Sequence, residues 1–321
     1  MKAIFQDGAK LVWREVEEPT VLPGEALIRV RAAGVNRADL AQRLGKYPPP
    51  PGASPILGLE AAGDVLSAPE GSGWEQGDRV CVLLTGGGYA ERVAVPARML
   101  MPVPRGLSYE QAAALPEVHL TAYLNLFLEA GLKPGERVLI HGGASGVGTA
   151  AIQQARLAGA RVATTSSAAK RDACRQLGAE LTLDREDPTW PQQLRNAWQS
   201  VDVILDMVGA STAHAGIDLL AMGGRLVWIA TLSGSTFELD IRSMMMRRLT
   251  LKGSTLRSRP LHEKITLRDA FLARFGEALD EGRIVPVIHE TVDIEQAEQA
   301  HASLQANATI GKIVLRLPVN E

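Results

Sequence analysis

The chain has 321 residues, a length that suggests two domains and allows a sizeable core without disulfides. Its 34 basic and 36 acidic side chains give a formal net charge of −2, which offers no general attraction for nucleic acid or an anionic membrane. The start, MKAIFQDGAK, has no apolar run long enough for a signal peptide, and Cys81 and Cys174 form neither a disulfide framework nor a metal-ligand spacing. We therefore expect a cytoplasmic globular protein with reduced thiols.

The first region, up to about residue 118, predicts a small and mostly β domain. Short alternating runs predict strands at 26–35, 77–84 and 90–95. Tyr47 precedes four consecutive prolines. Proline lacks the backbone donor that a helix requires, so this segment is expected to be an exposed loop.

The middle region, about 119–256, alternates strands with helices. Helices are expected after the first strand as far as Arg156, before Gly178, and near 212–221. Apolar strands that alternate with helices predict right-handed βαβ units and a parallel sheet buried on both faces. The expected strands are 137–143, 160–165, 181–183, 201–209, 225–230 and 249–255.

The tail predicts two helices and two strands. The helices are expected at about 266–281 and 294–306, and the strands near 284–292 and at 311–317. The last strand has no parallel partner nearby in sequence, so we expect it to return to the first domain. That domain is then discontinuous, with residues 1–120 and 257–321 around a central domain of residues 121–256.

A glycine-rich turn lies between the first strand of the middle region and the helix that follows. In this turn, Gly143 allows a tight reversal of the chain and Gly148 allows the helix to pack close to the sheet. Backbone donors at the helix start, with the helix dipole, predict a pyrophosphate site. Ser145 stands at the middle glycine of the usual G-x-G-x-x-G pattern, and a small serine still permits close approach.

The end of the second strand of this region favours NADP over NAD. An NAD site usually has an acidic residue there, whereas this chain has Thr164 to Ser167, followed by Lys170. Hydroxyl groups and a lysine suit a 2′-phosphate. The alternative is that Ser166 caps the next helix and Lys170 is solvated.

Zinc ligands and a serine nucleophile are both missing from the sequence pattern. The first region has one cysteine and no histidine before His119, whereas a catalytic zinc needs about three ligands. No G-x-S-x-G motif occurs with suitable partners. The remaining chemistry is that of a nicotinamide, which the protein would orient and shield from water.

Five segments carry a resemblance to a known family. They are AGVNRADLAQRLGKYPPPPGASPILGLEAAG at 33–63, GGGYAERVAVP at 86–96, ALPEVHLTAYLNLF at 114–127, KPGERVLIHGGASGVGTAAIQQA at 133–155 and IGKIVL at 310–315. Over nearly its whole length the chain resembles the zinc-free, zeta-crystallin-like quinone oxidoreductases of the medium-chain dehydrogenase/reductase superfamily. Within that group it is most similar to the p53-inducible branch.

The resemblance implies an α/β fold: a doubly wound Rossmann domain with a parallel sheet, and a GroES-like, mostly β catalytic domain built from both chain ends. It implies NADPH in the cleft and a quinone acceptor beside it. Zinc-dependent relatives have Gly-His-Glu where this chain has Gly58-Leu59-Glu60, and leucine cannot ligate a metal. The family comparison therefore agrees with the missing ligands.

The resemblance also implies site residues. Asn36 and Tyr47 are the polar groups expected near the nicotinamide and the substrate, as the catalytic pair. Thr121 is expected at the nicotinamide end, and Lys312 is expected to reach back to the cofactor. The other expected cofactor-binding residues are Gly143, Ala144, Ser145, Gly146, Val147, Gly148, Ser166, Lys170, Arg185, Ile229 and Leu256.

Structural alternatives remain open for several of these residues. Arg185 stands where relatives often place a tyrosine, and it either contacts the 2′-phosphate or lies on the surface. Asn36 is otherwise a turn amide, Tyr47 a packing residue and Thr121 a helix cap. Glu60 is expected to be a structural carboxylate, because no partner is identifiable from the sequence.

The expected function is NADPH-dependent, zinc-independent reduction of quinones, with ortho-quinones favoured and the choice between one-electron and hydride transfer left open. The first alternative is reduction of an activated carbon–carbon double bond in an alkenal or enoyl substrate. The second is a non-catalytic NADPH-binding structural protein. A homodimer is expected through the apolar strand at 249–255, since exposed sheet edges need covering. The methionines at 244–246 are expected to pack in the core, with a substrate wall or an interface as the alternative.

Overall fold

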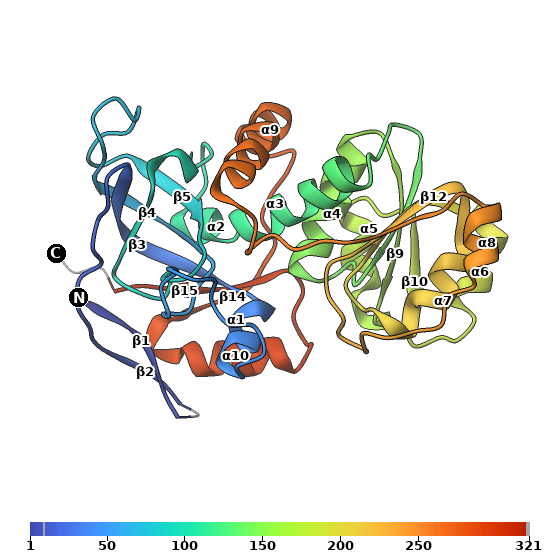
Figure 1. Ribbon diagram of the computed structural model, residues 1–321, viewed down its shortest axis with the longest axis horizontal. Coiled ribbons are helices and arrows are strands. Elements are labelled where there is room, and N and C mark those ends of the chain that lie inside the picture. The colour runs from blue at the N-terminus through green and yellow to red at the C-terminus, as the bar shows by residue number, and fades with distance from the viewer. Residues whose placement is uncertain (9, 319–321) are drawn as a thin grey trace. The chain divides into compact units, whose positions relative to one another are not determined.

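The computed structural model describes residues 1–8 and 10–318, and the chain divides into two compact units. Unit 1 comprises Met1–Leu120 and Leu256–Glu321, and unit 2 comprises Thr121–Thr255. Figure 1 shows both units, with their elements labelled where there is room. In the described part of the chain, no helix is both long enough and apolar enough to cross a membrane.

Unit 2 is built on a six-stranded sheet in which every neighbouring pair is parallel. The strand order β10-β9-β8-β11-β12-β13 places the first strand of the unit in the middle, which is the order of a doubly wound dinucleotide-binding fold. The α/β fold class expected from the sequence is confirmed. The strands are β8 (Arg137–His141), β9 (Arg161–Ser166), β10 (Leu181–Asp184), β11 (Val201–Asp206), β12 (Leu220–Trp228) and β13 (Thr250–Gly253).

Helices connect these strands, and the three expected from the sequence are present. Helix α6 (Trp190–Trp198) and helix α8 (Ile241–Met246) were not expected. The others are α4 (Gly146–Leu157), a 3-10 turn at Ala168–Lys170, α5 (Arg171–Leu177), α7 (Ala210–Leu219), and the end of α3 (Pro116–Tyr123), which continues as a π-helical segment at Leu124–Glu129.

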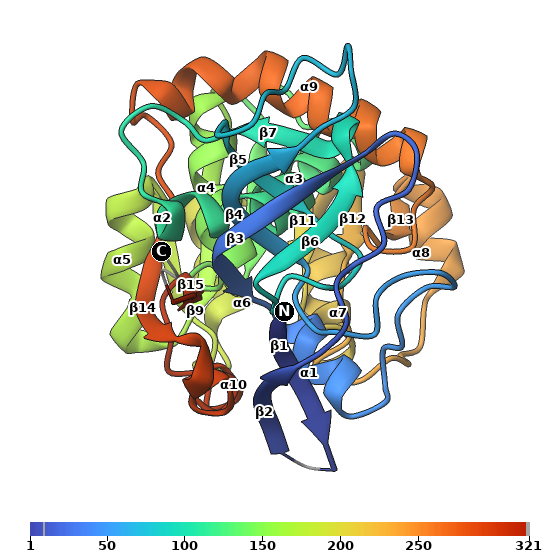
Figure 2. The same ribbon diagram turned by 90° about the vertical axis from the view of Figure 1, so that its left-hand side faces the viewer.

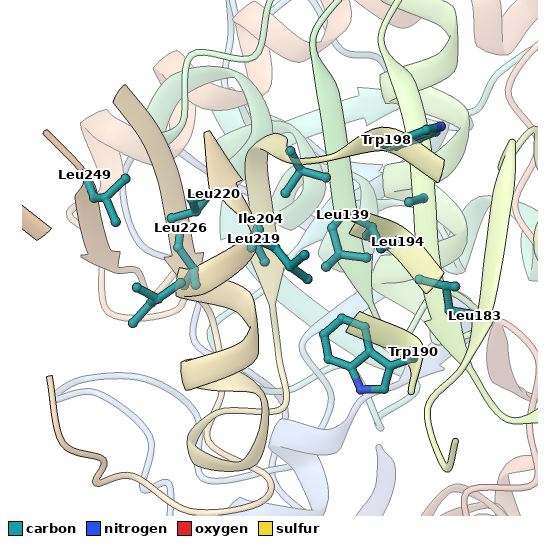
Figure 3. Close-up of a cluster of buried hydrophobic side chains, with 13 residues drawn as sticks. Leu139, Leu183, Trp190, Leu194, Trp198, Ile204, Leu219, Leu220, Leu226 and Leu249 are labelled. Carbon is teal, nitrogen blue, oxygen red and sulfur yellow. The ribbon is translucent and has the colours of Figure 1, made fainter. Parts of the chain in front are cut away.

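Helix α6 forms because one of its faces is apolar at a spacing of four residues. Trp190, Leu194 and Trp198 lie on this face and are buried. Figure 3 shows them with side chains of the sheet, among them Leu139 of β8. This cluster packs α6 against the sheet of unit 2.

Unit 1 is built on a seven-stranded sheet that is antiparallel except for the pair β14–β15. Its path runs β14-β15-β3-β4-β5-β7, and β6 also pairs with β3; Figure 2 shows β3, β4, β5 and β6. The strands are β3 (Glu25–Val35), β4 (Glu60–Ser67), β5 (Arg79–Leu83), β6 (Arg92–Pro96), β7 (Leu100–Pro102), β14 (Ile288–Asp293) and β15 (Lys312–Arg316).

Strand β15 brings the end of the chain back to the first domain. It pairs antiparallel with β3, with Ile313 opposite Val35. The expected return of the last strand is therefore confirmed. This pairing also places Lys312 beside the end of β3, where Asn36 begins the next helix.

The remaining elements of unit 1 are mostly short. The hairpin of β1 and β2 forms a separate two-stranded sheet, and it was not expected from the sequence. Neither were helices α1 and α2, which are five to seven residues long. The bounds are β1 (Lys2–Asp7), β2 (Lys10–Glu15), α1 (Arg37–Arg43), α2 (Tyr109–Ala113), α9 (Leu261–Asp280), α10 (Ala297–Gln305), and 3-10 turns at Ala97–Met99 and Ile294–Gln296.

Candidate nucleotide-binding and catalytic sites

The turn between β8 and α4 has the form of a phosphate cradle. Ser145 is the N-cap of α4, and its Oγ accepts a hydrogen bond from the Gly148 amide at 3.0 Å. Helix α4 then starts at Gly146. Capping by Ser145 fixes the first turn of α4, whose backbone N–H groups and dipole favour an anion.

Two glycines of this turn are required by close packing. A Cβ on Gly148 would lie 2.2 Å from the carbonyl oxygen of Gly142, and a Cβ on Gly143 would lie 2.6 Å from Cβ of Thr164. Neither position can hold a side chain unless the backbone moves. The residues present fit a dinucleotide pyrophosphate, for which Gly143, Ala144, Ser145, Gly146, Val147 and Gly148 remain the predicted contacts.

The ends of β9 and β10 come together beside this turn. Ser166 is the last residue of β9 and pairs with Asp184, and the Arg185 amide donates to the Ser166 carbonyl at 2.8 Å. The alternative that Ser166 caps a helix is wrong, because Ser167 holds the N-cap position and makes no side-chain cap bond. The 2′-phosphate contacts of Ser166 and of Lys170, which ends the 3-10 turn, remain predictions.

The side chain of Arg185 lies toward solvent and forms an ion pair with Glu186 at 3.1 Å. This exposed pair is weak, since both partners are hydrated, and the guanidinium can leave it for a phosphate at little cost. Its backbone position next to Ser166 is what places it near the predicted 2′-phosphate site. The phosphate contact of Arg185 stays a prediction.

Thr121 and Ile229 belong to unit 2, whereas Leu256 is a buried residue of unit 1. Thr121 lies inside α3 and not at its start, so the alternative of a helix cap is wrong. Ile229 directly follows β12, and its amide donates to the Asp206 carbonyl at 2.9 Å. It therefore lies at the carboxyl ends of β11 and β12, where open parallel sheets bind ligands.

In unit 1, Asn36 is almost fully buried at the start of α1, and its amide group is held on both sides. Its Nδ2 donates to Glu60 Oε1 at 2.9 Å, and its Oδ1 accepts from Lys312 Nζ at 2.5 Å. Asn36 is thus more than a turn amide. This bonding leaves its carbonyl oxygen committed to Lys312 before any substrate binds.

Lys312 and Glu60 form a buried ion pair at 2.6 Å, with side chains 4% and 0% exposed. The ammonium also donates to the Val35 carbonyl at 2.6 Å and to Asn36, so all three of its N–H donors are used. Lys312 therefore has no free N–H donor in this arrangement for the predicted contact with the cofactor. Glu60 is a structural carboxylate as expected, and its partner comes from the far end of the chain.

A second buried group, not predicted from the sequence, links α1 to α10. Asp39 accepts hydrogen bonds from the amides of Asn36 and Gly58, and the Tyr89 hydroxyl lies 3.2 Å from Asp39 and 3.3 Å from His301 Nε2. Burial raises the pKa of Asp39 to about 6, although the two amides oppose the shift. These contacts fix the start of α1 and thereby Asn36.

Tyr47 is half-buried, and Arg257 holds its loop. The Arg257 guanidinium donates to the Tyr47 carbonyl at 3.3 Å and to the Thr85 carbonyl at 2.7 Å, and it lies 5.3 Å from the centre of the Tyr47 ring. No hydrogen bond reaches the Tyr47 hydroxyl within the described residues. Burial and then the charge of Glu117 raise the pKa of the phenol, so it stays a neutral donor.

The residues at the zinc position of this fold do not fit the metal. Leu59 is buried and apolar, and both carboxylate oxygens of Glu60 are held, by Lys312 and Asn36 on one side and by the Glu117 amide on the other. Burial raises the pKa of the Cys81 thiol to about 12, which opposes the thiolate that zinc requires. The described residues contain no cluster of three or more potential metal ligands.

Comparisons with known proteins identify the family of this chain. Residues 146–271 match the zinc-binding dehydrogenase family, and residues 22–105 match the alcohol dehydrogenase GroES-like domain. The synaptic vesicle membrane protein VAT-1 homolog of Homo sapiens is 30% identical over 96% of this chain and 83% of its own length. The chain belongs to the medium-chain dehydrogenase/reductase superfamily. It is an oxidoreductase of this type, with a Rossmann-like unit and a GroES-like unit.

Other proteins that are similar to this chain differ widely from it in size. The spectinabilin polyketide synthase system protein NorB of Streptomyces orinoci is 38% identical over 92% of this chain, which spans only 13% of that protein. An NAD-dependent alcohol dehydrogenase superposes with a TM-score of 0.87 at 30% identity, covering 99% of this chain and 100% of the other.

Two further solved structures bear on cofactor and substrate class. Mycobacterial Rv1454c complexed with NADPH has a TM-score of 0.85 and 30% identity, with 98% of this chain and 99% of the other covered. The CurK enoyl reductase has a TM-score of 0.85 and 26% identity, with 99% and 98% covered. The NADPH complex supports nicotinamide cofactor binding by the Rossmann-like unit.

Proposed function

We propose that this medium-chain reductase transfers reducing equivalents from NADPH to acceptors with a double bond conjugated to a carbonyl group, with quinones, and ortho-quinones in particular, as the first substrate class. The observation that carries the reduction of a conjugated carbonyl compound is the polar site of unit 1. It includes a neutral phenol, Tyr47, whose hydroxyl has no hydrogen-bond partner among the described residues, and a buried amide, Asn36, whereas the zinc position carries Leu59. A neutral phenol can donate a hydrogen bond to the carbonyl oxygen of an acceptor, while the buried Asn36 holds the start of α1 in place.

The cofactor supplies the reducing equivalents when bound, and the chain contributes binding and orientation. The turn from Gly143 to Gly148 would hold the pyrophosphate, and Ser166 and Lys170 the 2′-phosphate. In unit 1, the Tyr47 hydroxyl would donate to the acceptor carbonyl. Asn36, fixed by Lys312 and Glu60, would keep the first turn of α1 in place.

A second candidate function is reduction of the carbon–carbon double bond of an alkenal or an enoyl thioester. It is favoured by the similarity to CurK, which is described as an enoyl reductase, and to a polyketide synthase protein. None of these five relatives is described as acting on a quinone. The quinone assignment therefore rests on the resemblance of the sequence segments, and a panel of substrates decides between the two functions.

The test is a panel of acceptors with NADPH and NADH: 1,2-naphthoquinone, 9,10-phenanthrenequinone, 1,4-benzoquinone, an alkenal and an enoyl thioester, with oxygen uptake recorded. Turnover of ortho-quinones with NADPH supports the first function, and oxygen uptake reveals one-electron transfer. Preference for the alkenal or thioester without oxygen uptake supports the second. Tight NADPH binding without any turnover overturns both and leaves an NADPH-binding structural protein. Metal analysis of the active protein tests zinc independence, which a stoichiometric, activity-linked zinc would contradict.

Substitution of Ser166 by aspartate is expected to reverse the cofactor preference. A carboxylate at the end of β9 repels a 2′-phosphate and offers acceptors to a ribose 2′-hydroxyl. We expect NADPH affinity to fall by about tenfold or more, which corresponds to about 1.4 kcal/mol, while NADH binding holds or improves. Fluorescence titration with both cofactors measures this. Equal loss of both cofactors would indicate simple damage to the turn and contradict the assignment.

We also propose a homodimer through the edge strand β13, which pairs only with β12 among the described strands. Helix α8 precedes this strand, and its Met245 and Met246 side chains are each 71% exposed. The expectation that these methionines pack in the core is thus wrong for the two, and large exposed apolar groups are typical of an interface.

Replacing both Met245 and Met246 with glutamate is expected to convert the dimer to a monomer, because charges are costly in a buried apolar contact. Light scattering after size-exclusion chromatography measures the mass. Leu44→Glu is the matched control, since Leu44 is 65% exposed in unit 1 and should not alter the mass. A wild-type monomer, or a dimer that survives the double substitution, would contradict this interface.

A further inference from the structure

Glu117 has a carboxyl group to which the function proposed above assigns no role. It lies in the first turn of α3 and is partly exposed. Its backbone amide donates to Glu60 Oε2 at 2.8 Å, but within the described residues no hydrogen bond or ion pair reaches its own carboxyl oxygens. An unpaired carboxyl against a buried carboxylate is costly as a structural element alone.

The charged groups around Glu117 are nearly all committed to other partners. Lys312 is bound by Glu60, and Lys264 Nζ donates to the Arg257 carbonyl at 2.6 Å. The Arg257 guanidinium is held by carbonyl oxygens and by Gln42. Among the described residues, no cation therefore forms an ion pair with Glu117. The groups that act on it or feel its charge are Glu60 of β4, Lys312 of β15, Asp39 of α1, Lys264 of α9, Tyr47 and Arg257.

These surroundings keep Glu117 protonated near neutral pH. Burial, and then the negative charge of Glu60, raise its pKa to about 8, while Lys312 opposes the shift. A carboxylic acid with a pKa near the working pH is suited to proton donation. The neighbouring Tyr47 phenol has its pKa raised in part by the charge of Glu117, so Tyr47 serves as a hydrogen-bond donor and not as an acid.

We propose that Glu117 is the general acid of this reductase and protonates the carbonyl oxygen of an acceptor that Tyr47 orients. The inference rests on the reductase function proposed above. The bound cofactor would supply a hydride to the acceptor, and the electron pair displaced onto that oxygen would need a proton. The O–H bond of Glu117 breaks and a new O–H bond forms on the acceptor. The carboxylate left behind takes up a proton from water, to which its partial exposure gives access.

Glu117→Gln tests this role, because it removes the acid while keeping the size and polarity of the side chain. In the wild type, kcat should fall as pH rises through about 8, since the acid must be protonated. In E117Q this fall in kcat at alkaline pH should disappear, and kcat should be lowered about 10²- to 10⁴-fold at neutral pH. Glu110→Gln is the matched control: Glu110 lies in the first turn of α2, and its loss should leave both values unchanged.

Two measurements that do not depend on turnover test whether Glu117 itself titrates near pH 8. The folded-state pKa of Glu117 lies above its ordinary value of 4.5, so the stability of the wild type relative to E117Q should decline as pH rises from about 5 to 8. Carbon-13 labelling of glutamate side chains should show one carboxyl that titrates near pH 8 and is absent in E117Q. NADPH affinity should be equal in both proteins.

The outcomes separate the two proposals. If the wild type turns over and E117Q keeps both its kcat and the fall in kcat at alkaline pH, the acid role is overturned. The reductase function is then unaffected. If Glu117 only stabilises α3 through the helix dipole, E117Q should be less stable than the wild type at every pH above 5, and the pH dependence of kcat should be unchanged. That result also overturns the acid role. Absence of turnover in the wild type, on every acceptor of the panel, overturns the reductase function and the acid role together.

Discussion

Gly148→Ala is expected to weaken NADPH binding by about tenfold or more and to lower thermal stability. The added Cβ would lie 2.2 Å from the Gly142 carbonyl oxygen, a distance that the turn cannot accept unless α4 moves away from it. Overpacking of this kind costs about 1–3 kcal/mol. The displaced helix start would also misplace the amides that are predicted to bind the pyrophosphate. Calorimetric titration with NADPH and thermal unfolding measure the two effects.

The matched control is Gly276→Ala in α9. A Cβ on Gly276 meets no atom within 4 Å and its backbone is helical. Alanine is the better helix former there, so stability should rise by about 0.5–1 kcal/mol. Wild-type affinity for NADPH in Gly148→Ala would show that the turn between β8 and α4 does not hold the cofactor.

Lys312→Met is expected to destabilise unit 1 strongly. It leaves the fully buried Glu60 carboxylate without its cation and removes the donor to Asn36 Oδ1. Breaking a buried ion pair by removing one partner costs about 3–5 kcal/mol, since the remaining charge is uncompensated. Urea unfolding of the whole chain, followed by a probe in unit 1, measures the loss.

Arg316→Met provides the control on the same strand. Arg316 pairs with Asp293 at 2.8 Å, but the two side chains are 55% and 57% exposed, so the pair contributes less than about 1 kcal/mol. The double substitution Glu60→Gln with Lys312→Met should recover part of the lost stability, because it removes the uncompensated charge. A loss for Lys312→Met no larger than for Arg316→Met would contradict the buried-pair argument.

The fold was largely predictable because long apolar runs dominate the parallel sheet. All six strands of unit 2 were expected from runs such as 137–143 and 201–209. Short polar elements were missed. Helix α1, for example, begins at a capping box formed by Asn36 and Asp39, directly after a long strand. The four-residue spacing of Trp190, Leu194 and Trp198 was a signal for α6 that the prediction did not use.

The candidate site was predictable where chemistry follows local sequence, and not where it depends on distant contacts. The glycine-rich turn between β8 and α4 could be identified because its glycines and its capping serine are within six residues of one another. Glu60 seemed to lack a partner, since Lys312 is 252 positions away in the chain and reaches it only through the pairing of β15 with β3. Glu117 carries no sequence signal at all, because its role follows from the charges packed around it.

The sequence by itself determined the fold class, the glycine-rich turn after β8 and the absence of an acidic residue at the end of β9. These features depend on apolar periodicity and on residues adjacent in the chain. Only the tertiary structure decided that Lys312 neutralises Glu60 and holds Asn36, and that Glu117 is left unpaired beside them. The physical reason is that burial and charge pairing are properties of the folded environment: a carboxyl group acquires its pKa from the groups that the fold brings against it.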